Sequence, residues 1–141
     1  MSATALYTDL SAYYDLLCAD IDYRAQSQAV LRLQRLFGNG GSRHLDLACG
    51  TGPHVRHFLD AGFQSSGLDL NPPMLAQAAL RCPEADFSCQ DMCAFELEQP
   101  VDLITCFLYS LHYSGSLARG QGRPDLHQAS QIGRASCRER V

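Results

Sequence analysis

Hydrophobic positions along the chain change their spacing several times, and each change marks a predicted element. Two stretches with helical spacing come first, over residues 8–18 and 22–37. After them, short apolar runs alternate with helical patterns. Predicted strands cover residues 44–48, 65–70, 85–90 and 101–106, and predicted helices cover residues 54–61 and a segment that begins after Asn71. This alternation predicts an α/β fold with a parallel sheet.

The longer of the two first helices has clear end signals. Asp22 is a good N-cap residue, and Gly38 is a good stop. Its apolar positions recur on one side of the predicted helix, and we expect that side to pack against the rest of the fold. These positions are Ala25, Ala29, Val30, Leu33, Leu36 and Phe37.

A glycine turn joins the first predicted strand to the helix that follows it. The strand ends at Ala48, and Gly50 and Gly52 come directly after it. Glycine allows a ligand to approach the backbone closely. The turn is not a dinucleotide fingerprint, because no third glycine follows, and it is not a P-loop, because the chain contains no lysine.

Acidic residues accompany the predicted ends of the first three strands. Asp46 lies just before the glycine turn, where its carboxylate would repel a pyrophosphate and attract an ammonium or sulfonium group. Asp69 closes the second strand, where a carboxylate can accept hydrogen bonds from ribose hydroxyls. Asp91 follows the third strand. In an open α/β sheet this carboxyl edge is where ligands bind.

The run Asp46-Leu47-Ala48-Cys49-Gly50-Thr51-Gly52 resembles motif I of the class I S-adenosylmethionine-dependent methyltransferases. Further resemblance lies in Gln90-Asp91-Met92, in residues 101–107 and in Ser11-Ala12-Tyr13-Tyr14-Asp15. The whole pattern is most similar to small-molecule N-methyltransferases of the amino-sugar and glycine/sarcosine type. It implies the N-terminal half of a Rossmann-like fold, with strands one to four preceded by cover helices.

The resemblance implies a set of residues that bind S-adenosylmethionine and release S-adenosylhomocysteine. They are Tyr14, Asp46, Ala48, Cys49, Gly50, Gly52, Asp69, Leu70, Met74, Asp91, Met92, Cys106 and Phe107.

Several of these residues have specific implied roles. Tyr14, with Tyr23, would close over the methionine part of the cofactor, although amphipathic packing explains both tyrosines equally well. Met74 would line the adenosine pocket. Asp91 would accept a hydrogen bond from the adenine amino group, or else act as a turn or helix-cap aspartate. Phe107 would flank the site of methyl transfer.

His112 lies just past the fourth predicted strand and is the candidate catalytic residue. A hydroxyl or carbon acceptor needs a base at this place, whereas an amine acceptor needs only to be neutral. The alternative for His112 is a histidine at the entry to a helix.

Charge and composition narrow the possible partners. The net charge is −4 with no basic block, which argues against nucleic acid. No apolar run approaches the length of a membrane span, and the first residues do not form a signal peptide. Seven cysteines without a C-x-x-C pair indicate reduced thiols in a cytoplasmic protein. We expect no metal site, and we assign His54 and His57 to a solvated helix face.

The chain divides into three predicted parts: a helical cover over residues 1–40, an incomplete cofactor-binding core over 41–119, and an aberrant tail over 120–141. Residues 131–141 resemble a sequencing-library adapter translated in one frame, and we exclude them from the fold. Without further strands the fourth strand would be an open edge. We therefore expect the chain to be a C-terminally truncated fragment, unstable and inactive, of an intact methyltransferase.

The function expected from the sequence is methyl transfer from S-adenosylmethionine to a small-molecule acceptor, most simply an amine. Two alternatives remain at this point. One is an NAD(P)-dependent oxidoreductase, which shares the acidic end of the second strand but requires a third glycine. The other is a non-catalytic cofactor-binding fragment or regulator.

Overall fold

A computed structural model describes residues 11–107 of the chain. Four parallel strands form one sheet with the order β3-β2-β1-β4. Strand β1 covers Arg43–Leu47 and lies in the interior of the sheet, between β2 (Gln64–Asp69) and β4 (Leu103–Cys106). Strand β3 (Asp86–Cys89) pairs with the outer side of β2. The predicted α/β fold with a parallel sheet is confirmed, with each strand slightly shorter than or offset from its prediction.

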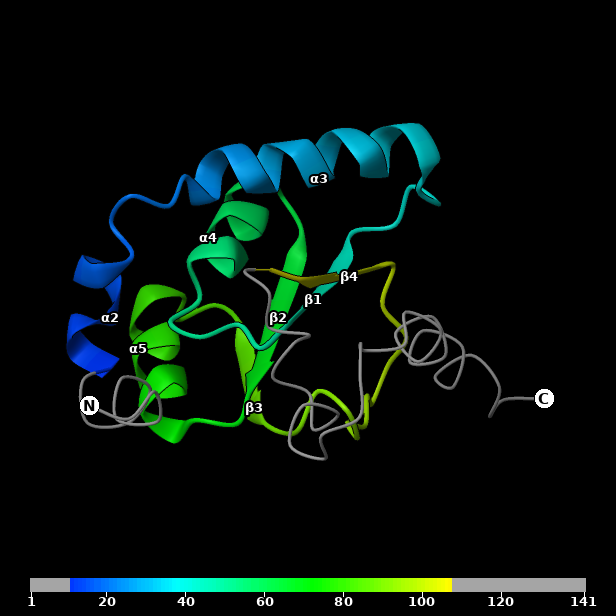
Figure 1. Ribbon diagram of the computed structural model, residues 1–141. Helices are drawn as coiled ribbons and strands as arrows, with labels where there is room; N and C mark the ends of the chain where they lie inside the picture. Colours follow the sequence, from blue (N-terminus) through cyan, green and yellow to red (C-terminus); the bar gives the residue numbers. More distant parts are fainter. Residues whose placement is uncertain (1–10, 108–141) are drawn as a thin grey trace, which may run out of the picture.

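Four helices accompany the sheet in the described residues: α2 (Ser11–Leu17), α3 (Tyr23–Phe37), α4 (Pro53–Asp60) and α5 (Pro72–Arg81). Helices α4 and α5 pack against the strands, and α3 crosses above α4 (Figure 1). None of these helices combines the length and the apolar character that crossing a membrane requires.

Local signals explain where two of the helices begin. The Asp22 side chain accepts a hydrogen bond from the backbone N–H of Ala25 at 2.8 Å, which confirms its predicted capping role for α3. Helix α5 follows Asn71, as predicted, and it has proline in its first turn. The Asn71 side chain makes no capping bond, however. Its amide donates instead to Asp69 at 2.9 Å.

The two faces of the sheet carry different cores. One face buries Leu45, Leu47, Leu68 and Met92, and the segment from Phe95 to Val101 packs over them. The other face lies beneath α4 and α5 and buries Cys49, Val55 and Cys82. Side chains alternate along β1, so Leu45 and Leu47 point to the first face while His44 points to the second and stacks on Phe58 of α4.

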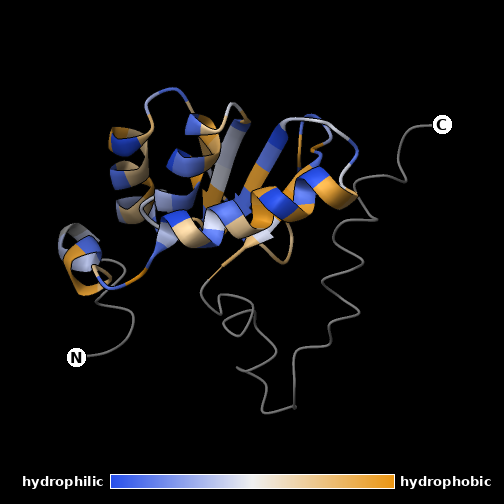
Figure 2. Ribbon diagram, turned by 90° about the horizontal axis from the view of Figure 1, so that it is seen from above, coloured by the Kyte–Doolittle hydropathy of each residue, from blue (hydrophilic) through white to orange (hydrophobic). Residues whose placement is uncertain are grey.

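The predicted apolar stripe of α3 is not where the helix contacts the fold. Leu33, Leu36 and Phe37 are 56%, 73% and 82% exposed. The buried residue of the helix is Ser27, whose hydroxyl donates to the Tyr23 carbonyl at 2.8 Å. Figure 2 shows hydrophobic positions along the outer side of the helix. The side of α3 that packs against the fold is therefore its polar side, which faces α4. Helical periodicity alone does not show which side of a helix packs against its neighbours.

Candidate cofactor site

The glycine turn between β1 and α4 has an unusual backbone conformation. Ala48, Gly50 and Gly52 have φ values of 52°, 55° and 78°, all in the left-handed region. Two backbone hydrogen bonds hold the turn: the Cys49 N–H donates to the Leu68 carbonyl at 2.9 Å, and the Gly52 N–H donates to the Cys49 carbonyl at 3.0 Å. The sequence pointed to the two glycines but not to Ala48, because an alanine gives no signal for a positive φ.

The two glycines of the turn serve different purposes. A Cβ atom added to Gly52 would lie 3.2 Å from the Cβ of Ala78, so this glycine allows α5 to pack close to the turn. A Cβ atom added to Gly50 would meet no atom of the described residues within 4 Å. The space beside Gly50 is therefore open, as a ligand that approaches the backbone requires.

Asp69 holds the turn from the end of the neighbouring strand. Its Oδ2 accepts from the Gly50 N–H at 2.9 Å, and its Oδ1 accepts from the backbone N–H of Asn71 and from the Asn71 amide, both at 2.9 Å. A carboxylate offers about four acceptor positions, so one remains. Binding both ribose hydroxyls would require the Asn71 amide to move aside.

Asp46 lies inside the fold rather than at its edge. It is 1% exposed, and its Oδ1 accepts from the Thr105 hydroxyl of β4 at 2.7 Å. Burial raises the pKa of Asp46 from 3.8 to about 7. Direct attraction of a cationic ligand, as expected from the sequence, is therefore weakened by the neutral fraction of this carboxyl group.

His44 extends the same buried network across three strands. Its Nδ1 lies 2.6 Å from the Ser65 hydroxyl and its Nε2 lies 2.8 Å from the Thr105 hydroxyl. Burial lowers the pKa of His44 from 6.5 to about 3, so the ring is neutral. The Thr105 hydroxyl donates its proton to Asp46, so its oxygen is free to accept a hydrogen bond from the Nε2–H of His44. This assigns the tautomer of His44, and Nδ1 accepts a hydrogen bond from the Ser65 hydroxyl. No sequence motif indicated this network.

Residues after β2 and β3 divide into exposed and buried groups. Leu70 is 60% exposed, and Asp91 is exposed with its Oδ1 accepting from the Cys93 N–H at 2.8 Å. Asp91 therefore makes the turn contact that was its alternative role. Met74 and Met92, at 1% and 9% exposed, lie in the core.

The end of β4 meets α4 through an aromatic stack. Phe107 lies parallel to the His54 ring, with centroids 3.6 Å apart and planes 7° apart. His54 is 3% exposed, and its Nε2 lies 2.8 Å from the Gln26 Oε1 of α3. The expectation that His54 belongs to a solvated helix face is wrong. His54 and Phe58, four residues apart, share the inner face of α4, a spacing that could have shown this.

Burial also keeps this histidine neutral. The pKa of His54 falls from 6.5 to about 4, chiefly through desolvation and secondarily through His57. Within residues 11–107, no three His, Cys, Asp or Glu side chains lie where they could hold a metal ion together.

The cover helices place tyrosines beside these elements. Tyr14 of α2 is half-buried, and Tyr23 lies edge-on to His54 with centroids 5.0 Å apart. The Tyr23 hydroxyl is buried and makes no hydrogen bond of normal geometry with any described residue. Burial, with the Cys18 thiol as a second cause, raises the Tyr23 pKa above its usual value, so the phenol keeps its proton as a donor. His112, the predicted base, lies outside the described residues.

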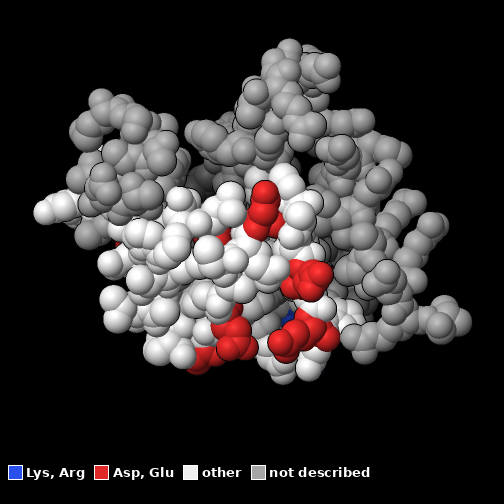
Figure 3. All heavy atoms as spheres, turned by 90° about the horizontal axis from the view of Figure 1, so that it is seen from below, with Lys and Arg blue, Asp and Glu red and all other residues white. Residues whose placement is uncertain are grey.

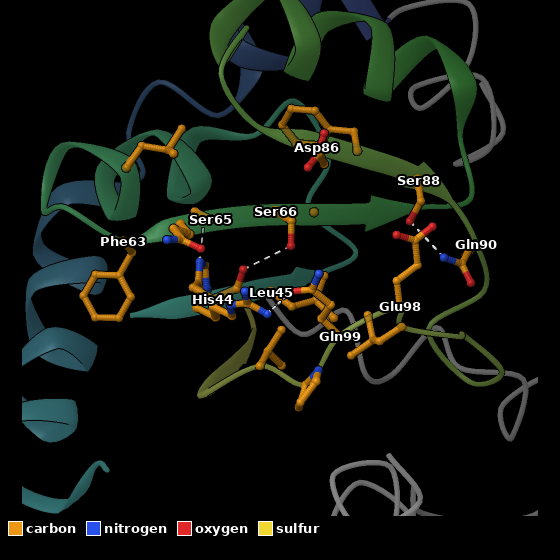
Figure 4. Close-up of a pocket in the computed structure, with 18 of the residues that line it drawn as sticks. His44, Leu45, Phe63, Ser65, Ser66, Asp86, Ser88, Gln90, Glu98 and Gln99 are labelled. Atoms are coloured by element: carbon orange, nitrogen blue, oxygen red, sulfur yellow. Dashed lines mark hydrogen bonds between the residues drawn. The ribbon is translucent and has the colours of Figure 1, made fainter. Parts of the chain in front are cut away.

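A separate cavity of about 840 Å³ lies beside the sheet (Figure 4). It is lined by the first residues of β1, by residues of β2 and β3, by Gln90 and by the segment from Glu96 to Val101. Ser66 and His44 meet there, with the Ser66 hydroxyl donating to the His44 carbonyl at 3.1 Å. The cavity does not coincide with the glycine turn, so it is not the candidate cofactor site.

Figure 3 shows acidic side chains gathered on the face seen from below.

Comparison with known proteins agrees with this geometry. Residues 45–122 match the family model described as "Methyltransferase domain". A dTDP-3-amino-3,6-dideoxy-alpha-D-glucopyranose N,N-dimethyltransferase of Streptomyces fradiae is 36% identical over 95 residues, which are 67% of this chain and 37% of that protein. The glycine/sarcosine N-methyltransferase of Halorhodospira halochloris is 42% identical over 59 residues, 42% of this chain and 22% of that protein.

Solved structures give the same result. CalS10, an amino pentose methyltransferase from Micromonospora echinaspora with bound S-adenosylmethionine, superposes with a TM-score of 0.70 at 28% identity, covering 84% of this chain and 48% of that one. DesVI of Streptomyces venezuelae gives 0.69 at 33% identity, covering 75% and 46%. The chain thus spans less than half the length of these relatives. It belongs to the class I S-adenosylmethionine-dependent methyltransferase family.

Proposed function

We propose that the protein carrying this chain transfers the methyl group of S-adenosylmethionine to the amino group of a small molecule, and that the amine is an amino sugar or an amino acid. The observation that carries the first part is the Gly50 turn, which is left-handed, tied to Asp69 and open on the side where a Cβ would project. The acceptor class rests on the relatives, whose names specify amino-sugar or glycine N-methylation.

The residues at the carboxyl edge can bind and orient the cofactor. When bound, S-adenosylmethionine supplies an electrophilic methyl group. Asp69 can accept from the ribose, Asp91 offers an exposed carboxylate for the adenine edge, and Leu70 offers exposed apolar surface beside it. The buried Tyr23 hydroxyl offers a further donor.

The chemistry requires little more than alignment and exclusion of water, because the sulfonium methyl is intrinsically reactive. The stacked rings of Phe107 and His54 form an apolar wall at the end of β4. His54 is neutral there, so it adds no charge that would repel a sulfonium. A neutral amine needs no base, and His112 is required only for an acceptor that must lose its proton before attack.

We also propose how the chain is organised, from the pattern of its sequence. Residues 1–40 form the cover and residues 41–119 belong to the cofactor-binding core. Within the described residues, the thiols of Cys18, Cys49, Cys82 and Cys89 form no disulfide, which supports a reducing compartment such as the cytoplasm. The proposed partner is the small-molecule acceptor.

Calorimetric titration tests the cofactor assignment. The full-length protein that carries this chain should bind S-adenosylmethionine and S-adenosylhomocysteine and should not bind NAD, because the turn lacks the third glycine of the dinucleotide site. Methyl transfer to a dTDP-amino sugar and to glycine, followed by mass spectrometry, tests the acceptor. Tighter binding of NAD than of the sulfonium ligand would refute the assignment. Binding without transfer to any amine would favour a regulator.

Asp69→Ala should weaken the binding of S-adenosylhomocysteine by about 1–3 kcal/mol, the usual effect of losing hydrogen bonds to a charged acceptor. The loss would have two sources, because Asp69 would accept from the ribose and also holds the Gly50 N–H. Asp69→Asn keeps one acceptor oxygen and should lose less. Asp86→Asn, on an exposed carboxylate outside the carboxyl edge, serves as the control. Equal affinity in wild type and Asp69→Ala would show that the ribose lies elsewhere.

A further inference from the structure

Three side chains that are far apart in the sequence meet on the outer side of the glycine turn. Arg81, the last residue of α5, donates through Nη1 to the Thr51 carbonyl at 2.9 Å and to the Thr51 hydroxyl at 3.0 Å. Its Nη2 forms an ion pair with the Asp15 carboxylate of α2. The Thr51 hydroxyl closes the ring by donating to Asp15 Oδ1 at 2.6 Å.

The arrangement fixes the turn through its backbone. Thr51 lies between the two left-handed glycines and is 1% exposed. Arg81 binds the carbonyl of Thr51, so it sets the orientation of the peptide that leads into Gly52. A guanidinium uses its planar set of donors for such two-point contacts, which lysine cannot reproduce.

The ring also ties a cover helix to the turn. Asp15 follows Tyr14 directly, and the two residues share the short helix α2, which packs beside α5 (Figure 1). Asp15 and Arg81 are 42% and 29% exposed in their side chains. Ion pairs with that much exposure contribute little to global stability. Their effect is therefore chiefly geometric, because the ring determines where α2 lies relative to Gly50.

We propose that Asp15, Thr51 and Arg81 form a latch that positions α2 over the cofactor turn, and that Asp15 and Arg81 are positioning residues for cofactor binding. This inference rests on the proposed function. Breaking the latch lets α2 move away, which exposes the site and releases the Thr51 peptide. The latch thus couples the docking of α2 to the affinity for the cofactor.

The chain offers a matched control for Arg81. Arg56 of α4 is 30% exposed and pairs with Asp60 at 2.8 Å and with Glu84 at 2.6 Å. It has the same charge and exposure as Arg81, and its partners lie outside both the turn and α2. Arg56→Gln therefore reproduces the loss of a surface ion pair without loss of the latch.

The test compares Arg81→Gln, Asp15→Asn, their double variant and Arg56→Gln. Calorimetry with S-adenosylhomocysteine should show about a tenfold loss of affinity in each latch variant, as expected for one charge-assisted hydrogen bond. The double variant should lose no more than the worse single, because both changes break one unit. Arg56→Gln should bind as wild type, and denaturant midpoints measure how much stability each variant loses.

Hydrogen–deuterium exchange distinguishes a positioning role of the latch from a role in stability alone. S-adenosylhomocysteine should slow exchange in residues 11–17 of wild type and of Arg56→Gln, but not of Arg81→Gln. Wild-type affinity in Arg81→Gln, or additive losses in the double variant, would overturn the latch. If wild type binds no S-adenosylhomocysteine, the proposed function fails, and the latch is then tested without ligand. Faster exchange of residues 11–17 in Arg81→Gln than in Arg56→Gln would support the latch, and equal exchange in the two variants would refute it.

Discussion

Gly50→Val should abolish detectable binding of S-adenosylhomocysteine while leaving the fold in place. Two effects combine. Gly50 has a φ of 55°, and a side chain in this region costs roughly 1–2 kcal/mol, with β-branched residues the worst placed. The added atoms would also project into the space beside the turn, where no atom of residues 11–107 lies within 4 Å of the new Cβ and where the proposed function puts the ligand.

The control variant must introduce the same backbone strain at a position away from the proposed ligand. Gly62 has a φ of 89°, and a Cβ added there would also meet no described residue within 4 Å, but it follows α4 outside the turn. Gly62→Val should therefore lose similar stability and keep full affinity. Calorimetry gives the affinities, and circular dichroism with thermal melting shows that both variants fold. Wild-type binding in Gly50→Val would place the cofactor elsewhere on the molecule.

Sequence reasoning succeeded where local signals decide the structure. The order of strands and helices followed from the alternation of short apolar runs with helical spacing, and Asp22 and Asn71 marked helix starts at the right positions. The glycine turn was located because only a few residue types allow a left-handed backbone, and two of its three left-handed positions are glycines.

The same reasoning failed where tertiary contact decides. Helix α3 has one apolar side and one polar side, and the pattern favoured the apolar side for packing. The polar side faces α4 instead, because Gln26 and Tyr23 meet the buried His54 ring. A histidine at the second position of a helix gives no sign of such a partner, which comes from a segment 28 residues away.

The buried network around Asp46 was also invisible in the sequence. Its members come from three strands, and only their side-by-side order in the sheet brings them together. His44, Thr105 and Asp46 are each less than 9% exposed. This burial has a measurable consequence, because a group that titrates differently in the folded and unfolded states makes stability depend on pH.

Three buried groups set this dependence, with opposite signs. The pKa of Asp46 rises from 3.8 to about 7, so its contribution is fully present below pH 3.8 and is lost as the pH rises to about 7. The pKa values of His44 and His54 fall from 6.5 to about 3 and about 4, so their contribution is present above pH 6.5 and is lost as the pH falls. Between about pH 4.5 and pH 6 these three groups hold about two protons in the unfolded chain, both on the histidines, and about one proton in the folded chain, on Asp46.

The unfolding free energy of wild type should therefore rise with pH in this window by about 1.4 kcal/mol per unit, the slope for one proton. Asp46→Asn keeps an acceptor oxygen for Thr105 and removes the proton that folded Asp46 holds. The slope of its unfolding free energy against pH should therefore double to about 2.7 kcal/mol per pH unit. Asp20→Asn, on an exposed carboxylate, should keep the wild-type slope. Urea unfolding at half-unit steps from pH 4.5 to 6.0 measures all three. Equal slopes in wild type and Asp46→Asn would mean that Asp46 is ionised throughout this range and that its burial in the folded protein is less complete than the structure shows.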